Sequence, residues 1–160
     1  MSSGMFGLPK GNLGSDINCI VSKSSSVFTN AASGTEVAIP NFLIDFPASG
    51  EYPVIIEFVP DGSSAQAAVI EAVTGPQLIA GLSLFRDGID IGRPYVRSNV
   101  SVDPSIRVAT PSSSFRFVDF PSKGTHQYLV KLRNDSNGTC SIEATKMIVR
   151  EDRSIRYKQL

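Results

Sequence analysis

The side chains that could do acid–base or metal chemistry are few, and they are scattered along the chain. His126 is the single histidine. A catalytic histidine needs a nucleophile and an orienting acid beside it, and a zinc site needs several ligands, of which one histidine supplies one. Because His126 enters an alternating apolar run in phase with Tyr128, we interpret it as a structural residue.

Paired carboxylates could hydrolyse glycosides, which would be the least strained enzymatic activity for this chain. The sequence contains no Gly-x-Ser-x-Gly elbow, no phosphate loop and no Cys-x-x-Cys pair, and with no Trp a stacked sugar would need Tyr95 or Tyr157. We therefore expect a protein that is not an enzyme and has no catalytic residue, cofactor or metal. The acidic candidates lie apart, mostly at turns or on solvent-side strand positions: Asp45, Glu57, Glu71, Asp87, Asp90, Asp103 and Asp119.

The two cysteines, Cys19 and Cys140, are too few for a disulfide framework. Both have apolar neighbours, so we expect buried free thiols; a single bridge between the first and last strands is the alternative. Asn99, Asn134 and Asn137 begin glycosylation sequons. We interpret all three as turn chemistry, because nothing in the sequence indicates secretion.

Composition narrows the expected partners. The 160 residues match one domain, and fifteen acidic residues balance fifteen basic ones. Nucleic-acid binding draws on clustered Lys and Arg, and a membrane span needs about 20 consecutive apolar residues. We therefore expect neither nucleic acid nor a membrane as a partner. Zero net charge gives little repulsion between copies, which suits a chain that packs against other proteins.

Short strands must position these side chains. From residue 17 onward, alternating apolar runs are separated by turn residues, a pattern typical of a sandwich or barrel. Residues 65–73 have a helical composition but too few residues for a core helix, so we predict a strand and keep the helix as the alternative. The alternating sets are Tyr52, Val54, Ile56 and Phe58; Leu78, Ala80, Leu82 and Leu84; Ile106 and Val108; Phe115 and Phe117; and His126, Tyr128, Val130 and Leu132.

Two turn segments and one change of phase complete the pattern. Asp87-Gly88 stands between apolar runs and predicts a hairpin. Residues 134–138 predict a second hairpin between the final two strands, since Asn and Gly tolerate positive φ. Within residues 140–149 the apolar phase slips, which predicts a β-bulge.

Together these patterns predict an all-β fold, a sandwich or barrel. The sandwich domain is expected over residues 17–151, an extended N-terminal arm over residues 1–16 and a charged C-terminal tail over residues 152–160. The arm is rich in Gly, which a packed element would not tolerate well. Its apolar residues need a covering partner, and they are Met5, Phe6, Leu8 and Leu13.

Two stretches of the sequence resemble a known family. Residues 82–92 resemble a hairpin common in viral structural proteins with a tumour-necrosis-factor/C1q-like jelly roll. Residues 117–132, with their Pro and Gly-Thr-His-x-Tyr segment, and residues 142–151, which end in Val-x-Glu, resemble that family's last strands. The match covers about half the chain, residues 78–151. It departs from the family at Ile89, where a Thr often follows the Asp-Gly, and the arm has no counterpart.

The resemblance implies a two-sheet antiparallel jelly-roll sandwich and a compact homotrimer, and it carries over no catalytic residue. In tailed bacteriophages such domains serve as head decoration or cement proteins, fibre knobs and tail parts. We expect a virion protein that decorates or cements the capsid surface as a homotrimer. Its partners would be the major capsid protein or other virion proteins, and it would be made in the host cytoplasm. The expected capsid contacts are the apolar residues of the arm, Met5, Phe6, Leu8 and Leu13. The alternative is a tail or fibre knob that binds a host receptor or surface glycan through loops at residues 61–64, 97–104 and 111–114.

Subunit contacts in such an assembly are expected from apolar residues at outward strand positions. A large exposed apolar patch implies a partner, and stable interfaces bury many residues on each side. The candidates break the polar-outward phase of their strands: Ile55, Val59, Phe85, Tyr95 and Leu129.

Overall fold

A computed structural model describes most of the sandwich domain. The described residues are 19–23, 29–60, 69–72, 77–99, 108–111, 115–136, 138–142 and 144–154. The predicted arm, with Met5, Phe6, Leu8 and Leu13, lies outside these residues, as does most of the charged tail.

Every regular element in the described residues is a β-strand, and every pairing is antiparallel. No helix of this part is long and apolar enough to cross a membrane. The strands are β1 (Cys19–Lys23), β2 (Thr29–Ala31), β3 (Thr35–Ala48), β4 (Val54–Pro60), β5 (Val69–Ala72), β6 (Gln77–Arg86), β7 (Ile89–Gly92), β8 (Tyr95–Asn99), β9 (Val108–Pro111), β10 (Arg116–Asp119), β11 (Gly124–Asn134), β12 (Cys140–Ile142) and β13 (Thr145–Glu151).

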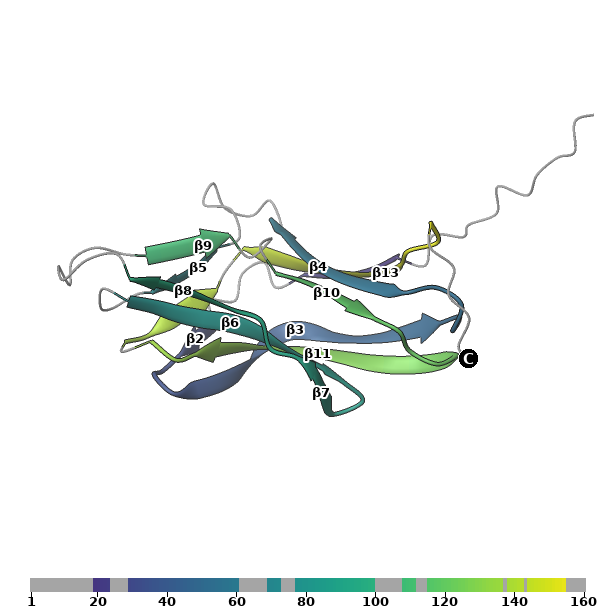
Figure 1. The fold of residues 1–160 in the computed structure, drawn as a ribbon, viewed down its shortest axis with the longest axis horizontal. Coiled ribbons are helices and arrows are strands. Elements are labelled where there is room, and N and C mark those ends of the chain that lie inside the picture. The colour runs from purple at the N-terminus through teal and green to yellow at the C-terminus, as the bar shows by residue number, and fades with distance from the viewer. Residues whose placement is uncertain are drawn as a thin grey trace, which may run out of the picture.

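The strand pairing is nested in the manner of a rolled hairpin. β1 pairs with β13, β3 with β11, β4 with β10, and β6 with β7, so strands early in the chain pair with strands late in it. One layer has the order β1-β13-β4-β10 and the other β3-β11-β6-β7, with β8 also on β6. This is the two-sheet jelly-roll arrangement that the sequence predicts. The two layers face each other in Figure 1.

A third, short sheet lies at one end of the sandwich and was not predicted. It has the order β2-β12-β5-β9, and Figure 1 shows β5 and β9 beyond the end of β4. β5 covers the described part of residues 65–73, so the predicted strand is confirmed over residues 69–72. The segment forms a strand despite its helical composition, because both of its edges are paired, one with β12 and the other with β9.

Side-chain alternation builds the core between the two layers. On β11, Tyr128, Val130 and Leu132 face inward and are fully buried. Phe58 of β4 joins the layers, because its ring stacks on Phe42 at 5.7 Å between centroids and meets Phe117 edge-on. Burial of such alternating apolar faces is the main stabilising contribution to a sandwich.

The hairpin predicted at Asp87-Gly88 is confirmed. Both residues have positive φ, 53° and 80°, and join β6 to β7. This conformation matches the type I′ turn, whose twist suits the flanking strands. The turn is also held against β11, because the Asp87 backbone N–H donates to the Gln127 carbonyl at 2.9 Å.

The hairpin predicted at residues 134–138 is wrong. β11, which precedes it, pairs with β3 and β6, whereas β12, which follows it, pairs with β2 and β5. The segment therefore carries the chain from one sheet to another. Turn residues report that the chain reverses or bends, and they do not report which strands then pair.

The β-bulge predicted within residues 140–149 is also wrong. The phase slips because two strands of different sheets meet there: β12 ends at Ile142 and β13 begins at Thr145. Ala144 between them has φ of 49°, which an L-residue rarely adopts. A register irregularity does occur elsewhere, between β11 and β3 at Leu129 and Lys131.

The burial expected of the cysteines is confirmed at Cys140, whose thiol lies 4.0 Å from the Ser136 hydroxyl. Of Cys19 only the backbone, in β1, is described. The two strands stand in different sheets, β1 beside β13 and β12 beside β2 and β5.

Candidate functional site

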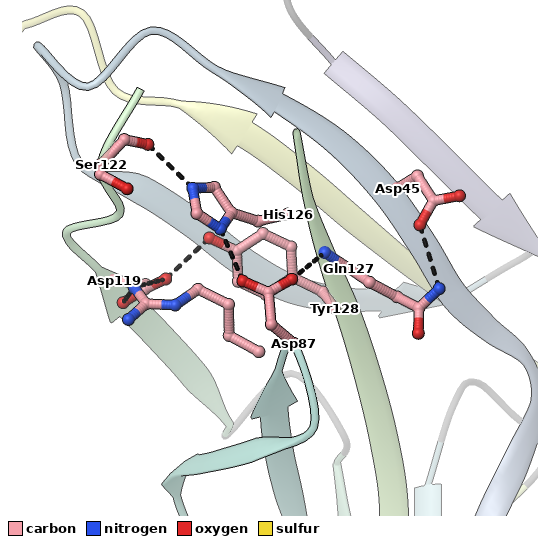
Figure 2. A network of polar contacts seen from close by, with 8 residues as sticks. Asp45, Asp87, Asp119, Ser122, His126, Gln127 and Tyr128 are labelled. Carbon is pink, nitrogen blue, oxygen red and sulfur yellow. Dashed lines mark hydrogen bonds and ion pairs between the residues drawn. The ribbon is translucent and has the colours of Figure 1, made fainter. Parts of the chain in front are cut away.

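A polar cluster lies where the β6–β7 turn meets the start of β11, and Figure 2 shows its members. His126 is its centre and its side chain is 13% exposed. The ring Nδ1 lies 2.7 Å from the Asp87 carboxylate, and Nε2 lies 2.8 Å from the Ser122 carbonyl oxygen. The other Asp87 oxygen accepts the Gln127 backbone N–H at 2.8 Å. We call these four residues the His126 cluster.

The His126 cluster is consistent with a protonated ring. The hydrogen bond to Asp87 raises the pKa of His126 above its ordinary value of 6.5, the Ser122 carbonyl raises it further, and partial burial opposes both. Asp87 responds in the opposite direction: the hydrogen bonds from His126 and from the Gln127 N–H lower the pKa of its carboxyl.

A second cluster crosses between the two layers close by. Arg86 Nη1 donates to both oxygens of Asp119 at 2.8 and 2.9 Å, and the Tyr128 hydroxyl donates to Asp119 at 2.7 Å. Burial raises the pKa of Tyr128, and its bond to Asp119 adds to the rise. Asp119 is thus a buried hydrogen-bond acceptor that connects β10 to β6 and β11. The sequence alone places most acidic residues at solvent-facing positions and does not predict this role.

The chemistry of these groups is that of a structural clasp. Ser122 offers its backbone carbonyl to His126, so the Ser122–His126–Asp87 sequence of contacts has no nucleophile. Among the described residues, no three His, Cys, Asp or Glu side chains gather in a way that could hold a metal ion. The interpretation of His126 as a satisfied structural residue agrees with its contacts.

A shallow polar pocket of about 200 Å³ opens on the outer face of the β3-β11-β6-β7 layer. Its charged side chains already bind one another: Arg133 pairs with Asp135, and Arg93 pairs with Asp90. Glu36 accepts the Ser83 hydroxyl and lies near the Lys131 ammonium. The pocket is therefore a patch of compensated charge, and its walls are Gly34, Thr35, Glu36, Arg93, Arg133 and Asp135.

Apolar side chains form a row across that same outer face. Leu43 of β3 stands opposite Leu129 of β11, which stands opposite Phe85 of β6. Leu43 is 53% exposed, and the other two are partly buried. The Lys131 ammonium lies 4.2 Å from the centre of the Phe85 ring, a cation–π contact at the edge of the row. We call Leu43, Leu129 and Phe85 the apolar row.

The five predicted interface residues fall on different surfaces. Phe85 and Leu129 are adjacent in the apolar row, and Tyr95 of β8 is exposed. Val59 lies on the outer face of the other layer and is partly buried. The outward exposure expected of Ile55 is wrong, since it is only 2% exposed.

The burial of Ile55 follows from the position of its strand. β4 is an inner strand, and its cross-strand neighbours at this position are Val118 on β10 and Arg150 on β13. The Arg150 side chain is held in place by Glu57 at 3.2 Å, so Ile55 has a valine on one side and a fixed arginine on the other. An isoleucine in an outward phase is thus not a free surface residue when its strand is central.

Other exposed apolar residues were missed by the sequence reasoning. Leu43 lies between the buried Phe42 and Ile44, so its outward phase was readable from alternation. Val118 and Phe120 follow the inward Phe117 in the same way, and Ile89 follows the Asp-Gly turn. All four are exposed by more than half.

The structure describes only part of the predicted glycosylation sequons and receptor-binding loops. Asn134 ends β11, and its side-chain oxygen accepts the Ser136 backbone N–H at 2.8 Å, which is turn chemistry as expected. Its side chain is fully buried and is therefore not an accessible glycosylation site. Asn137 and the side chain of Asn99 lie outside the described residues, as do the loop residues 61–64, 100–104 and 112–114.

The comparisons with known proteins concern structures alone. No family model matches the sequence, and no curated protein matches it. Among solved structures, a chain of the T13 viral particle of infectious bursal disease virus matches with 8% identity and a TM-score of 0.48, over 84% of this chain and 31% of that one. The VP2 subviral particle of infectious bursal disease virus matches with 8% identity and a TM-score of 0.34, over 89% of this chain and 42% of that one. The chain thus spans less than half the length of either.

Proposed function

We propose that the chain is a non-enzymatic virion structural protein that decorates or cements the capsid surface as a homotrimer. The observation that carries the proposal is the apolar row, which presents Leu43, Leu129 and Phe85 side by side on an outer sheet face. The resemblance of residues 78–151 to bacteriophage jelly-roll proteins is the reason for proposing a virion protein. The proposed partners are a second copy, the major capsid protein and other virion proteins.

The surroundings of the apolar row suit a contact surface. Interfaces between proteins place apolar and aromatic side chains at their centre and polar groups at their rim. Asp45 and Gln127 flank the row on one side, and Lys131 flanks it on the other. The polar groups of the same face bind one another in ion pairs, which leaves the apolar side chains as the part of this face with most to gain from a partner.

The trimer is tested by the mass of the purified chain in solution. Light scattering after size-exclusion chromatography should give three times the 17.1 kDa of one chain. Leu43→Lys should lower the mass towards that of one chain, because a charge buried at an interface centre is costly. Val118→Lys is the matched control, since Val118 is equally exposed, at 53%, on the outer face of the opposite layer.

Two results would contradict the assigned surface. A wild-type chain that is monomeric at micromolar concentration would exclude the trimer. A trimer that survives Leu43→Lys and is lost with Val118→Lys would move the contact to the opposite layer.

The virion location is tested on intact particles. Gold-labelled antibodies raised against the chain should decorate the heads of particles in electron micrographs. Deletion of residues 2–16 should abolish capsid binding while the sandwich stays folded and trimeric. Label at the tail tip would support the alternative, a knob that binds a host receptor or glycan, and no label on any particle would overturn the virion role.

A further inference from the structure

The bonding around His126 depends on the charge of its ring. Each of its two ring nitrogens faces an acceptor: a carboxylate oxygen of Asp87 at 2.7 Å and the carbonyl oxygen of Ser122 at 2.8 Å. A neutral imidazole has one N–H and one lone pair, so it can donate to only one of them. Both contacts are therefore hydrogen bonds only when the ring is an imidazolium with two N–H groups.

We propose that His126 is a charge-dependent tether that, as an imidazolium, joins the β6–β7 turn to the β10–β11 connection and releases the Ser122 carbonyl when it loses its proton. The remaining N–H of the neutral ring stays with Asp87, because a hydrogen bond to a carboxylate is stronger than one to a carbonyl. The lone pair on Nε2 then faces the Ser122 oxygen and repels it. The tether is a property of the folded chain and does not depend on the proposed virion role.

The charged and titratable groups around the ring come from each element packed against it. The β6–β7 turn supplies Asp87, and β6 supplies Arg86, whose positive charge opposes protonation but is itself paired with Asp119 of β10. β3 places the apolar Phe46 opposite His126, and β11 supplies Tyr128, which burial keeps neutral. The Asp87 carboxylate is thus the group that favours the imidazolium, and it makes direct contact.

The position of the Ser122 carbonyl determines which part of the chain loosens when the tether is released. Ser122 lies in the connection between β10 and β11, two residues after the exposed Phe120. At its other end the connection is packed closely: a side chain added at Gly50 would meet the Lys123 backbone N at 2.6 Å. Release of the carbonyl therefore loosens a connection that is otherwise fitted against the loop after β3.

Because the chain has a single histidine, nuclear magnetic resonance reads the tether without ambiguity. In ¹⁵N-labelled protein both ring nitrogens should carry protons at pH 6, and the midpoint of the titration should lie above 6.5. The Ser122 carbonyl ¹³C shift and the Lys123 amide shift should move with the same midpoint. A neutral tautomer at pH 6, or a carbonyl shift that ignores the titration, would overturn the proposal.

Matched variants separate the tether from general electrostatics. Asp87→Asn keeps a residue that tolerates positive φ in the turn but removes the carboxylate, and it should lower the titration midpoint clearly. Asp45→Asn removes a carboxylate that bonds to the Gln127 side chain and not to the ring, and it should leave the midpoint unchanged. Equal shifts in the two variants would contradict the tether.

Amide hydrogen exchange gives a readout that does not depend on the two aspartate variants. After correction for the intrinsic pH dependence of exchange, protection of residues 123–127 should fall between pH 6 and pH 8.5 in the wild-type chain. His126→Gln, whose amide cannot become a cation, should show no such fall over the same range. A wild-type profile identical to that of His126→Gln would overturn the proposal.

Discussion

Two polar clusters lie near the two ends of β11, and they hold the chain with different chemistry. The His126 cluster and its neighbour Asp119 use charged groups and remain partly open to solvent, with Arg86 27% exposed. At the other end, Asn134 is fully buried and neutral. Its side-chain N–H groups donate to the carbonyls of Ala31 and Gly138 at 2.8 and 2.7 Å, and its oxygen accepts the Ser136 N–H at 2.8 Å.

The two clusters show where charged and neutral polar groups are each tolerated. Neutral hydrogen bonds can be buried completely if every partner is present, and they are then insensitive to pH. The segment 134–138 uses them to cross between sheets, and Ser136 adds a further bond by accepting the Ile79 N–H at 2.7 Å. The charged cluster occupies the end where water still reaches the side chains, because burying ions fully is costly.

The largest loss of stability is expected in the neutral cluster around Asn134. Asn134→Ala removes the donor to the buried Ala31 carbonyl and to the part-buried Gly138 carbonyl, and it removes the acceptor of the Ser136 N–H. These losses should lower the free energy of unfolding by about 3 kcal/mol or more. Urea denaturation measures the loss. Gln127→Ala removes an exposed amide side chain with a single 3.2 Å bond and is the control; its loss should stay within about 0.5 kcal/mol. A loss at Asn134 below about 1 kcal/mol would contradict the importance of this cluster.

A smaller loss is expected for Asp119→Ala at the charged end. The variant leaves Arg86 and the buried Tyr128 hydroxyl without their shared acceptor, and the partial exposure of Arg86 should limit the loss to about 2 kcal/mol. Denaturation of Asp119→Ala, Arg86→Ala and the double variant gives the coupling between the two side chains. A double variant as destabilised as the sum of the single ones would show that the ion pair contributes nothing.

Tyr128→Phe should cost less still, about 1 kcal/mol. The ring stays buried in the core, and Asp119 keeps both contacts with Arg86. The same denaturation assay applies. If Tyr128→Phe proved as damaging as Asp119→Ala, the hydroxyl and not the ion pair would be the principal bond of the cluster.

The smallest effect, at most about 1 kcal/mol, is the pH dependence that separates the two clusters. The pKa of His126 is raised in the folded chain, so its contribution is complete below pH 6.5 and is lost as the pH rises through the folded pKa. The pKa of Asp87 is lowered from 3.8, so its contribution is present above that pH and is lost as the pH falls through the folded pKa.

The corresponding measurement compares two variants at two pH values. The stability difference between wild type and His126→Gln should shrink from pH 6 to pH 8.5, whereas that between wild type and Asn134→Ala should stay constant. The distinction between charged and neutral clusters would be contradicted if the stability difference for Asn134→Ala changed with pH, or if that for His126→Gln did not.

Local alternation predicted much of the fold and part of the candidate surface. The inward sets on β4, β6 and β11 are those that the apolar pattern indicates, and Phe85 and Leu129 were named from the outward phase. Leu43 could have been named by the same rule. Ile55 could not have been excluded by it, because its burial depends on β4 being central, which is a property of the sheet and not of the strand.

Local sequence was sufficient to predict which side chains face inward, where the chain turns at Asp87-Gly88, and that the fold is all-β. These are properties of neighbouring residues, set by the two-residue period of a strand and the φ preferences of Asp and Gly. The folded chain was needed to show that residues 134–138 cross between sheets and that Arg86 contacts Asp119, 33 positions away. Strand partners and registers depend on how distant segments pack, because any strand edge offers the same N–H and C=O groups to every other.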